Sequence, residues 1–307
     1  MKKPRVLITG GTGLLALNWA CAVRDQWDVI LGTHLHRVSL SGVTSAPLDL
    51  DNWAHLEDQI ALNHPDLIVH TVGLTNVEAC EADTKMAFHV NAVLAENVAR
   101  VANRLGLPFV HVSTDHLFAG ESSFYTEKAS PKPLNEYGHS KLLAEELVQK
   151  ACQYAIILRT NFFGWGYTQR RSFSDWLIYG LRAGERLPLF DDVYFTPILA
   201  DILAQTAHDL VTERCSGIFN VVGDQRLSKY DFALSLAESF NLPASLIQRV
   251  QSPVENIRLV RPRDMSLSNT KVCTILNSKM GTVRDYLLEL KRQEQTGRRQ
   301  ELIAAVT

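Results

Sequence analysis

The feature that most constrains the fold lies near the start of the chain, where a short apolar segment runs into a cluster of glycines. Arg5–Thr9 (RVLIT) has the composition of a strand, and residues 14–25 carry apolar side chains at helical spacing. The glycine turn between them can bring the backbone close to a pyrophosphate, and the helix N-terminus supplies N–H donors. The alternative is a tight turn that binds nothing. We predict a dinucleotide-binding turn and assign to it Gly10, Gly13, Leu14 and Leu15.

Short apolar segments alternate with helical ones through the first half of the chain. After the first strand, further strands are expected at Asp28–Thr33, Leu67–Thr71, Phe109–Ser113 and Tyr154–Arg159. Helices expected at 52–63, 85–105 and 134–151 separate them. This alternation predicts an α/β fold with a doubly wound, parallel Rossmann sheet that is covered on both faces.

The second half is less regular and suggests a smaller unit. It contains expected helices at 173–183, 200–211 and from a Ser228 cap to Phe240, and an expected strand at 217–223. The expected organisation is an NADP-binding Rossmann domain at 1–163 with 194–222 returning to it, a C-terminal α+β substrate-binding domain at 164–193 and 223–290, and a polar tail at 291–307.

The residues after the second strand bear on the choice of cofactor. An acid there would bind the ribose 2′-hydroxyl of NAD, but the sequence reads Thr33, His34, Leu35, His36 and Arg37. Arg37 can pair with a 2′-phosphate, which favours NADP over NAD; the alternative is an ordinary surface charge. Asp49 can accept a hydrogen bond from the adenine amino group. Further predicted cofactor residues are His36, Leu50, Thr71, Val72 and Gly73.

Tyr137 and Lys141 stand four residues apart, about one helical turn, so their side chains share one face of a helix. A lysine ammonium favours the phenolate, so we expect Lys141 to lower the pKa of Tyr137 and tune it as an acid–base group. Lys141 can also bond the nicotinamide ribose. Thr114, at the end of the fourth strand, can donate to a substrate oxygen, with Ser113 as the alternative donor. The predicted catalytic residues are Thr114, Tyr137 and Lys141.

Composition narrows the function classes. A net charge of −2 gives no electrostatic footprint for nucleic acid or an anionic membrane. No apolar run is long enough for a membrane span, and the N-terminus lacks the apolar stretch of a signal peptide. The histidines and the five cysteines show no metal-site spacing, so no metal is expected. These features predict a cytoplasmic protein.

Many blocks of the sequence, taken in order, resemble extended short-chain dehydrogenases/reductases of the dTDP-4-dehydrorhamnose reductase type. Among them are VLITGGTGLLA (6–16), VSTDHLFAG (112–120), YGHSKLLAEE (137–146) and RPRDMSLSNTK (261–271). The resemblance implies a Thr–Tyr–Lys catalytic set, which falls on Thr114, Tyr137 and Lys141. It also implies NADPH-dependent reduction of a 4-keto-6-deoxy sugar carried on a nucleoside diphosphate, by a monomer or homodimer.

The predicted substrate residues follow the strand ends and the RPRD motif: Thr75, Asn76, Asp115, His116, Asn161, Phe162 and Arg261. Arg263 and Glu78 are weaker candidates, and Trp165 and Trp176 either line the base pocket or belong to the core. Three departures from the family pattern surround this site. His116 stands where a tyrosine is common, a frequent tryptophan is replaced around Phe162, and a usual Ala-Ala pair reads Val72-Gly73.

Two other functions fit the same motifs. One is a nucleotide-sugar epimerase or dehydratase that holds NAD tightly, although the basic residues His36 and Arg37 argue against it. The other is a non-catalytic, NADP-binding regulatory subunit, because residues 224–243 are also similar to the regulatory β-subunit of methionine adenosyltransferase.

Overall fold

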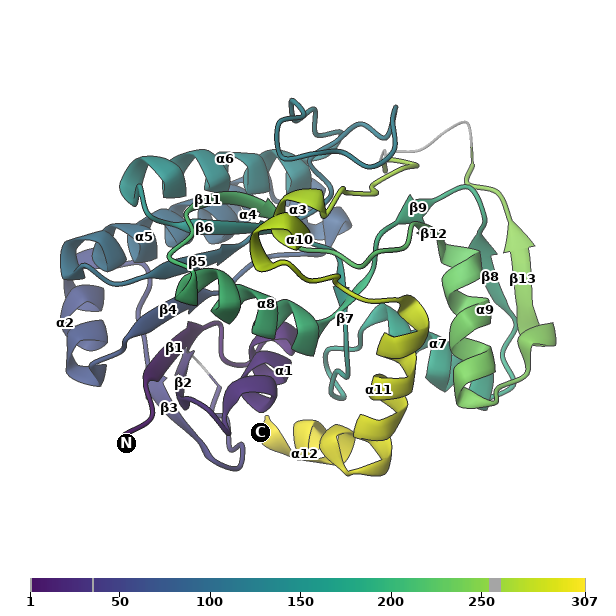
Figure 1. Ribbon diagram of the computed structural model, residues 1–307, viewed down its shortest axis with the longest axis horizontal. Helices are drawn as coiled ribbons and strands as arrows, with labels where there is room; N and C mark the ends of the chain where they lie inside the picture. The colour runs from purple at the N-terminus through teal and green to yellow at the C-terminus, as the bar shows by residue number, and fades with distance from the viewer. Residues whose placement is uncertain (1, 35, 254–260, 307) are drawn as a thin grey trace.

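A seven-stranded parallel sheet forms the centre of the computed structural model, which describes residues 2–34, 36–253 and 261–306; predicted ranges that include the other residues extend outside this description. The strand order is β11-β6-β5-β4-β1-β2-β3, which reverses direction between β1 and β4 (Figure 1). The strands are β1 (Arg5–Thr9), β2 (Asp28–Thr33), β3 (Val43–Pro47), β4 (Leu67–His70), β5 (Phe109–Val112), β6 (Ile156–Arg159) and β11 (Gly217–Asn220). This is the predicted doubly wound Rossmann arrangement, in which ligands bind at the carboxyl ends of the strands beside the reversal.

Successive strand residues enter two different cores, because side chains alternate between the faces of a sheet. Leu7 faces one core, while Val6 and Ile8 face the other. The first core is closed by α2 (Trp53–Asn63), α5 (Leu94–Leu105) and α6 (Glu136–Ala151), and the second by α1 (Leu14–Val23) and α8 (Ala200–Thr212). Both faces of the sheet are therefore covered, as the near-continuous apolar strands predicted.

The long helix expected at 85–105 is interrupted by a turn of π-helix. The segment consists of α4 (Thr84–Phe88), the π-helical η1 (His89–Val93) and α5, and it follows the short α3 (Val77–Ala82). Within η1, the Asn91 side chain accepts from the Leu74 backbone N–H at 2.7 Å and donates to Ser140 Oγ at 2.8 Å. The π turn thus connects the chain leaving β4 to α6, which carries Tyr137 and Lys141.

The second half adds helices and three two-stranded sheets beside the carboxyl end of the main sheet (Figure 1). The pairs are β7 (Phe162–Phe163) with β10 (Ile198–Leu199), β9 (Tyr194–Phe195) with β12 (Leu227–Ser228), and β8 (Leu187–Phe190) with β13 (Ile247–Val250). Its helices are α7 (Phe173–Arg182), α9 (Lys229–Phe240), the 3-10 turn η2 (Ala244–Leu246) and α10 (Thr270–Leu276). The boundaries predicted for a separate substrate domain remain a prediction.

The structure differs from the sequence analysis in two places. The polar tail expected at 291–307 is instead the end of α11 (Val283–Gln295) followed by α12 (Arg298–Ala305), in which Leu302 is buried and Glu301 pairs with Arg24 at 2.5 Å. The strand β3 was not anticipated, because its sequence, VTSAP, has one buried side chain and no apolar alternation. In both places, packing against distant parts of the chain orders a segment that is polar in sequence.

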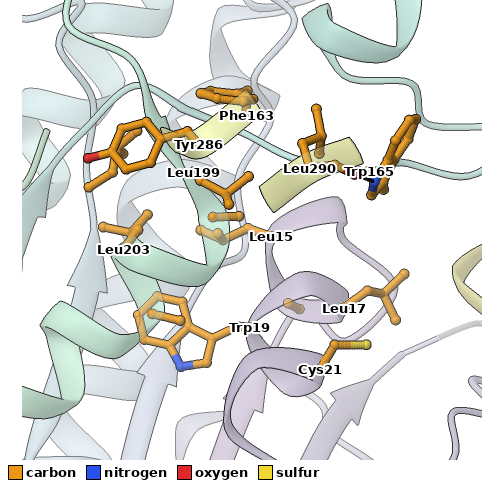
Figure 2. Packing of buried hydrophobic residues seen from close by; sticks show 14 of the residues in the cluster. Leu15, Leu17, Trp19, Cys21, Phe163, Trp165, Leu199, Leu203, Tyr286 and Leu290 are labelled. Atoms are coloured by element: carbon orange, nitrogen blue, oxygen red, sulfur yellow. Dashed lines mark hydrogen bonds between the residues drawn. The ribbon is translucent and has the colours of Figure 1, made fainter. Parts of the chain in front are cut away.

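Trp165, which was predicted either to line the base pocket or to belong to the core, lies in the core between α1, α8 and α11. Its side chain lies among buried apolar residues close to Leu290 (Figure 2), and its indole N–H donates to the Leu290 carbonyl at 2.9 Å. Trp165 is therefore a core residue. Trp176, on α7, is partly exposed and stacks on Phe173.

Candidate active site

A cavity of about 440 Å³ opens at the carboxyl ends of β1, β2 and β4, beside the reversal of strand order. Its wall contains the glycine turn, the end of β2 and the residues that follow β4. Of the predicted cofactor residues, those in the wall are Gly10, Gly13, His36, Leu50, Thr71, Val72 and Gly73. The structure thus brings residues from four separate segments to one cavity.

The glycines are needed because the turn leaves no room for side chains. Gly10 has a φ of +75°, and a Cβ there would lie 3.0 Å from Val72 Cγ2. A Cβ on Gly11 would lie 2.8 Å from Leu31 Cβ. Gly13 is the N-cap of α1 and has no side chain to accept a hydrogen bond. The Gly13 cap therefore leaves the first backbone N–H groups of the helix without a side-chain acceptor. This arrangement fits a pyrophosphate.

Six predicted cofactor residues are not among the described residues that line this cavity: Leu14, Leu15, Arg37, Asp49, Tyr137 and Lys141. Leu15 points into the core between α1 and α8 (Figure 2). Arg37 is exposed, and the Asp49 carboxylate accepts from the Asp51 N–H at 3.1 Å. Leu35 lies outside the described residues.

Two charged cavity residues were not predicted from the sequence, Asp51 and Arg170. Arg170 comes from the loop between β7 and α7, where Tyr167 donates a hydrogen bond to the Thr12 carbonyl of the glycine turn at 2.8 Å. The two loops are 155 residues apart in sequence. No local pattern signals such an approach.

Tyr137 is the second residue of α6, and its side chain is only 8% exposed. Asn135 caps the helix by accepting from the Gly138 N–H at 2.9 Å. Burial raises the pKa of Tyr137 above its ordinary value, while a hydrogen bond with Thr114 lowers it and the charge of Asp115 raises it. The direction is opposite to the lowering expected from Lys141, because desolvation of the phenolate dominates in the chain alone. A protonated phenol is the form that gives a proton to a substrate.

Lys141 lies one turn further along α6 and is buried. Its ammonium donates to the Val112 carbonyl at 2.7 Å and lies 3.3 Å from Nε2 of His111. Burial lowers the pKa of Lys141 to about 8, and Glu145 partly opposes this. The Lys141 ammonium has three N–H donors, and two of them are directed at Val112 and His111. One N–H is left for another partner.

The two candidate hydroxyls at the end of β5 have different partners. Ser113 donates to the Glu145 carboxylate at 2.6 Å, and Glu145 forms a buried ion pair with Arg159 at 2.7 Å. The Thr114 hydroxyl instead donates to Asp115 Oδ1 over a long 3.4 Å and interacts with Tyr137. Since the Ser113 hydroxyl is committed to a structural network, the geometry favours Thr114 as the donor to a substrate oxygen.

Three predicted substrate residues gather beside Tyr137. Asp115 accepts from Asn161 Nδ2 at 2.6 Å, and the His116 ring packs edge-on to Tyr137 with a centroid separation of 5.5 Å. Burial raises the pKa of Asp115 to about 6 and lowers that of His116 to about 4. At neutral pH the group is an anionic acceptor beside a neutral imidazole.

The other predicted substrate residues lie further out or serve local structure. Thr75 is exposed, and Asn76 caps α3 by accepting from the Ala79 N–H at 2.7 Å. Phe162 belongs to β7. Two cations are paired with acids, Arg261 with Glu78 and Arg263 with Asp192.

Lys229 is a further residue near this group that sequence analysis missed. It begins α9, and its ammonium lies 3.3 Å from the centroid of the Phe195 ring and 4.9 Å from that of Phe173. Burial lowers its pKa to about 8, and the charge of Asp115 opposes the lowering. Nothing in the sequence around Lys229 distinguishes it from a surface lysine.

Comparison with known proteins adds the family context. A family model described as the RmlD substrate binding domain matches residues 4–295. In the part of the chain that the structure describes, no helix is both long enough and apolar enough to cross a membrane.

The chain is similar to named proteins with different roles. It is 29% identical over 291 residues to a Haloferax volcanii protein named "Probable low-salt glycan biosynthesis reductase Agl14", covering 92% of this chain and 96% of that one. It is 29% identical over 240 residues to dTDP-4-dehydrorhamnose reductase of Escherichia coli K12, covering 76% and 77%. It is also 28% identical over 264 residues to the methionine adenosyltransferase 2 subunit beta of Xenopus laevis, covering 80% and 75%.

Two solved structures share the architecture. A hypothetical dTDP-4-dehydrorhamnose reductase from Sulfolobus tokodaii has a TM-score of 0.78 at 31% identity, covering 91% of this chain and 97% of that chain. The dTDP-4-dehydrorhamnose reductase of Bacillus anthracis, in complex with NADP, has a TM-score of 0.83 at 22% identity, covering 95% and 99%. At the latter identity the likeness concerns the fold alone.

Proposed function

The chain belongs to the RmlD substrate binding domain family and is an NAD(P)-dependent oxidoreductase, and we propose that it reduces a 4-keto-6-deoxy sugar carried on a nucleoside diphosphate, using NADPH. The observation that carries the proposal is the buried set of Thr114, Tyr137 and Lys141 at the carboxyl edge of the sheet that also forms the glycine-lined cavity. The names of the bacterial and archaeal relatives agree with it.

We assign a task to each side chain. A nicotinamide cofactor held by the glycine-lined cavity would supply the hydride for the carbonyl carbon. Tyr137 gives its proton to the carbonyl oxygen, and its raised pKa keeps it protonated until the oxygen becomes basic. Thr114 donates to the same oxygen and stabilises the developing charge. Lys141, held by His111 and Val112, keeps one N–H that we propose bonds the cofactor ribose.

The cofactor is proposed to lie along the cavity with its pyrophosphate at Gly10–Gly13 and its adenosine end near His36, Leu50 and Asp51. Arg37 follows His36 of the cavity wall and is exposed, and we propose that it pairs with a 2′-phosphate on the adenosine ribose. NADP is therefore favoured over NAD.

The test is consumption of NADPH by purified protein with dTDP-4-keto-6-deoxyhexose, followed by absorbance at 340 nm. Turnover that depends on both reactants, and that yields a 4-hydroxy product by mass spectrometry, supports the proposal. No oxidation of NADPH with any 4-keto nucleotide sugar would refute it.

A second candidate is a non-catalytic regulatory subunit, which the similarity to the methionine adenosyltransferase subunit favours. In that role NADP binds without turnover, and Tyr137→Phe protein behaves as the wild type does. Co-purification of a partner protein, together with no NADPH consumption, would support this candidate over the reductase.

A further inference from the structure

Lys229 occupies a position that helix electrostatics disfavour. It is the first residue of α9, a 12-residue helix whose N-terminal end carries partial positive charge. Its neighbours follow the usual pattern, since Ser228 caps the helix by accepting from the Asp231 N–H at 3.0 Å. A lysine here needs a compensating interaction elsewhere.

The Lys229 ammonium has aromatic neighbours but no hydrogen-bond acceptor in the described part of the chain. It lies 3.3 Å from the Phe195 ring centroid and 4.9 Å from the Phe173 ring centroid. Cation–π attraction stabilises the charge but satisfies none of its three N–H donors. A half-buried ammonium whose donors have no acceptor among the described residues is suited to bind a ligand oxygen.

Asp115 supplies the opposite charge beside the catalytic residues. One of its carboxylate oxygens accepts from Asn161, and the other lies 3.4 Å from Thr114 Oγ1 and 4.0 Å from His116 Nε2. Lys229 and Asp115 are linked through Asn161, whose side chain bonds Asp115 and whose carbonyl accepts from the Ile198 N–H at 3.1 Å. Ile198 lies three residues after Phe195, the ring next to the Lys229 ammonium, and each charge opposes the shift that burial causes in the pKa of the other group. These two described residues form no ion pair within 4.0 Å.

We propose that Lys229 and Asp115 together bind one hydroxyl group of the sugar ring, on a carbon next to the keto carbon. This inference rests on the proposed function. The ammonium donates to the hydroxyl oxygen, and the hydroxyl donates to the carboxylate. A neutral hydroxyl fits better than an anion or a cation, because Asp115 repels the first and Lys229 the second. Thr114, which contacts Asp115 and Tyr137, puts this hydroxyl beside the reacting carbonyl.

The test compares two substrates with wild-type protein and Lys229→Met. The substrates are dTDP-4-keto-6-deoxyhexose and its analogue in which the 3-hydroxyl is replaced by hydrogen. For wild type, kcat/KM should fall about 10- to 100-fold with the analogue, the size expected for a hydrogen bond to a charged group. With the full substrate, Lys229→Met should lower kcat/KM by a similar factor. With the analogue, Lys229→Met should lower kcat/KM by less than about threefold relative to the wild type, because the two changes remove the same interaction.

Two further variants separate this role from a structural one. Lys229→Arg keeps a donor and should retain most of the discrimination between the two substrates. Lys271→Met is the matched control, because Lys271 also lies over a phenylalanine, 3.8 Å from the Phe219 centroid, but bonds the Ile218 carbonyl. It should leave the discrimination unchanged. Thermal unfolding of every variant shows whether any loss comes from misfolding, in which case Lys229→Arg carries the test.

The outcomes distinguish the two claims. If the wild type turns over and Lys229→Met or Lys229→Arg shows losses that simply add to those of the analogue, the hydroxyl site is wrong and the reductase stands. If the wild type consumes no NADPH with any 4-keto nucleotide sugar, both claims fall together.

Discussion

The two halves of the molecule each place one lysine near the proposed reacting centre, and the two are held differently. Lys141, in the Rossmann half, donates to the Val112 carbonyl at 2.7 Å and contacts His111. Lys229, in the second half, is held by aromatic rings and by the charge of Asp115. Burial lowers both pKa values to about 8. The first cation is fixed by hydrogen bonds and the second keeps its donors available.

This difference suggests that the two halves have different tasks, one in cofactor binding and the other in sugar recognition. Every turnover uses the same cofactor, so the Lys141 ammonium can be held rigidly by its hydrogen bond to the strand β5. A sugar is recognised through hydroxyls at different positions, which suits a donor brought by a separate element, α9. We therefore expect changes in the Rossmann half to affect cofactor binding and chemistry, and changes at Lys229 to affect sugar selectivity.

The largest effect is expected for Tyr137→Phe, which removes the proton donor of the Rossmann half. The turnover number should fall by about 10³-fold, within the usual range for general acid catalysis. NADPH affinity, measured by fluorescence titration, should change little. Tyr154→Phe is the control, because Tyr154 is 75% exposed. Unchanged turnover in Tyr137→Phe would contradict the chemistry assigned to this half.

The next effect separates the two lysines directly. Lys141→Met should weaken NADPH binding and lower kcat, together by about 10²-fold in kcat/KM, because a charge-assisted contact to the cofactor is lost. Lys229→Met should leave the dissociation constant of NADPH unchanged and raise KM for the sugar. If both variants weaken NADPH equally, the division between the halves is wrong.

The pH dependence should sharpen the contrast. The proposed sugar site needs ionised Asp115 and protonated Lys229, so kcat/KM should fall about tenfold per pH unit below pH 6 and again above pH 8. NADPH binding depends on protonated Lys141 and should weaken only above about pH 8. Asp115→Asn should remove the acid limb for the sugar. If kcat/KM of Asp115→Asn still falls below pH 6, the fall is caused by the titration of another group.

The smallest effect is expected at Arg37. Arg37→Gln should weaken NADPH binding about two- to fivefold relative to NADH binding, because an exposed ion pair contributes little. Arg171→Gln, on an exposed arginine in the second half, is the comparison. Equal affinities for both cofactors in the wild type would remove the preference predicted from the residues after β2.

Local patterns predicted the parts of the fold that local forces decide. The glycine turn, the apolar strands and the Ser228 cap are visible in sequence because each is a property of a few neighbouring residues. The relation between Tyr137 and Lys141 is equally local, since both lie on α6. The predicted direction of the Tyr137 pKa shift was wrong, because desolvation depends on all the residues that cover the phenol.

Long-range contacts decided the rest. The strand β3 and helix α12 are ordered by packing against β2 and α1, which their own composition does not announce. Arg170 reaches the cavity through a loop far from the glycine turn in sequence.

The amino-acid sequence by itself therefore determined the Rossmann architecture and the Tyr–Lys pair, because periodicity and helical spacing act over a few residues. Only the tertiary structure decided that Lys229 lies near Asp115 and that Ser113 is bound to Glu145. The reason is that charge interactions and desolvation depend on distance in space, and 114 positions of chain separate the first two residues.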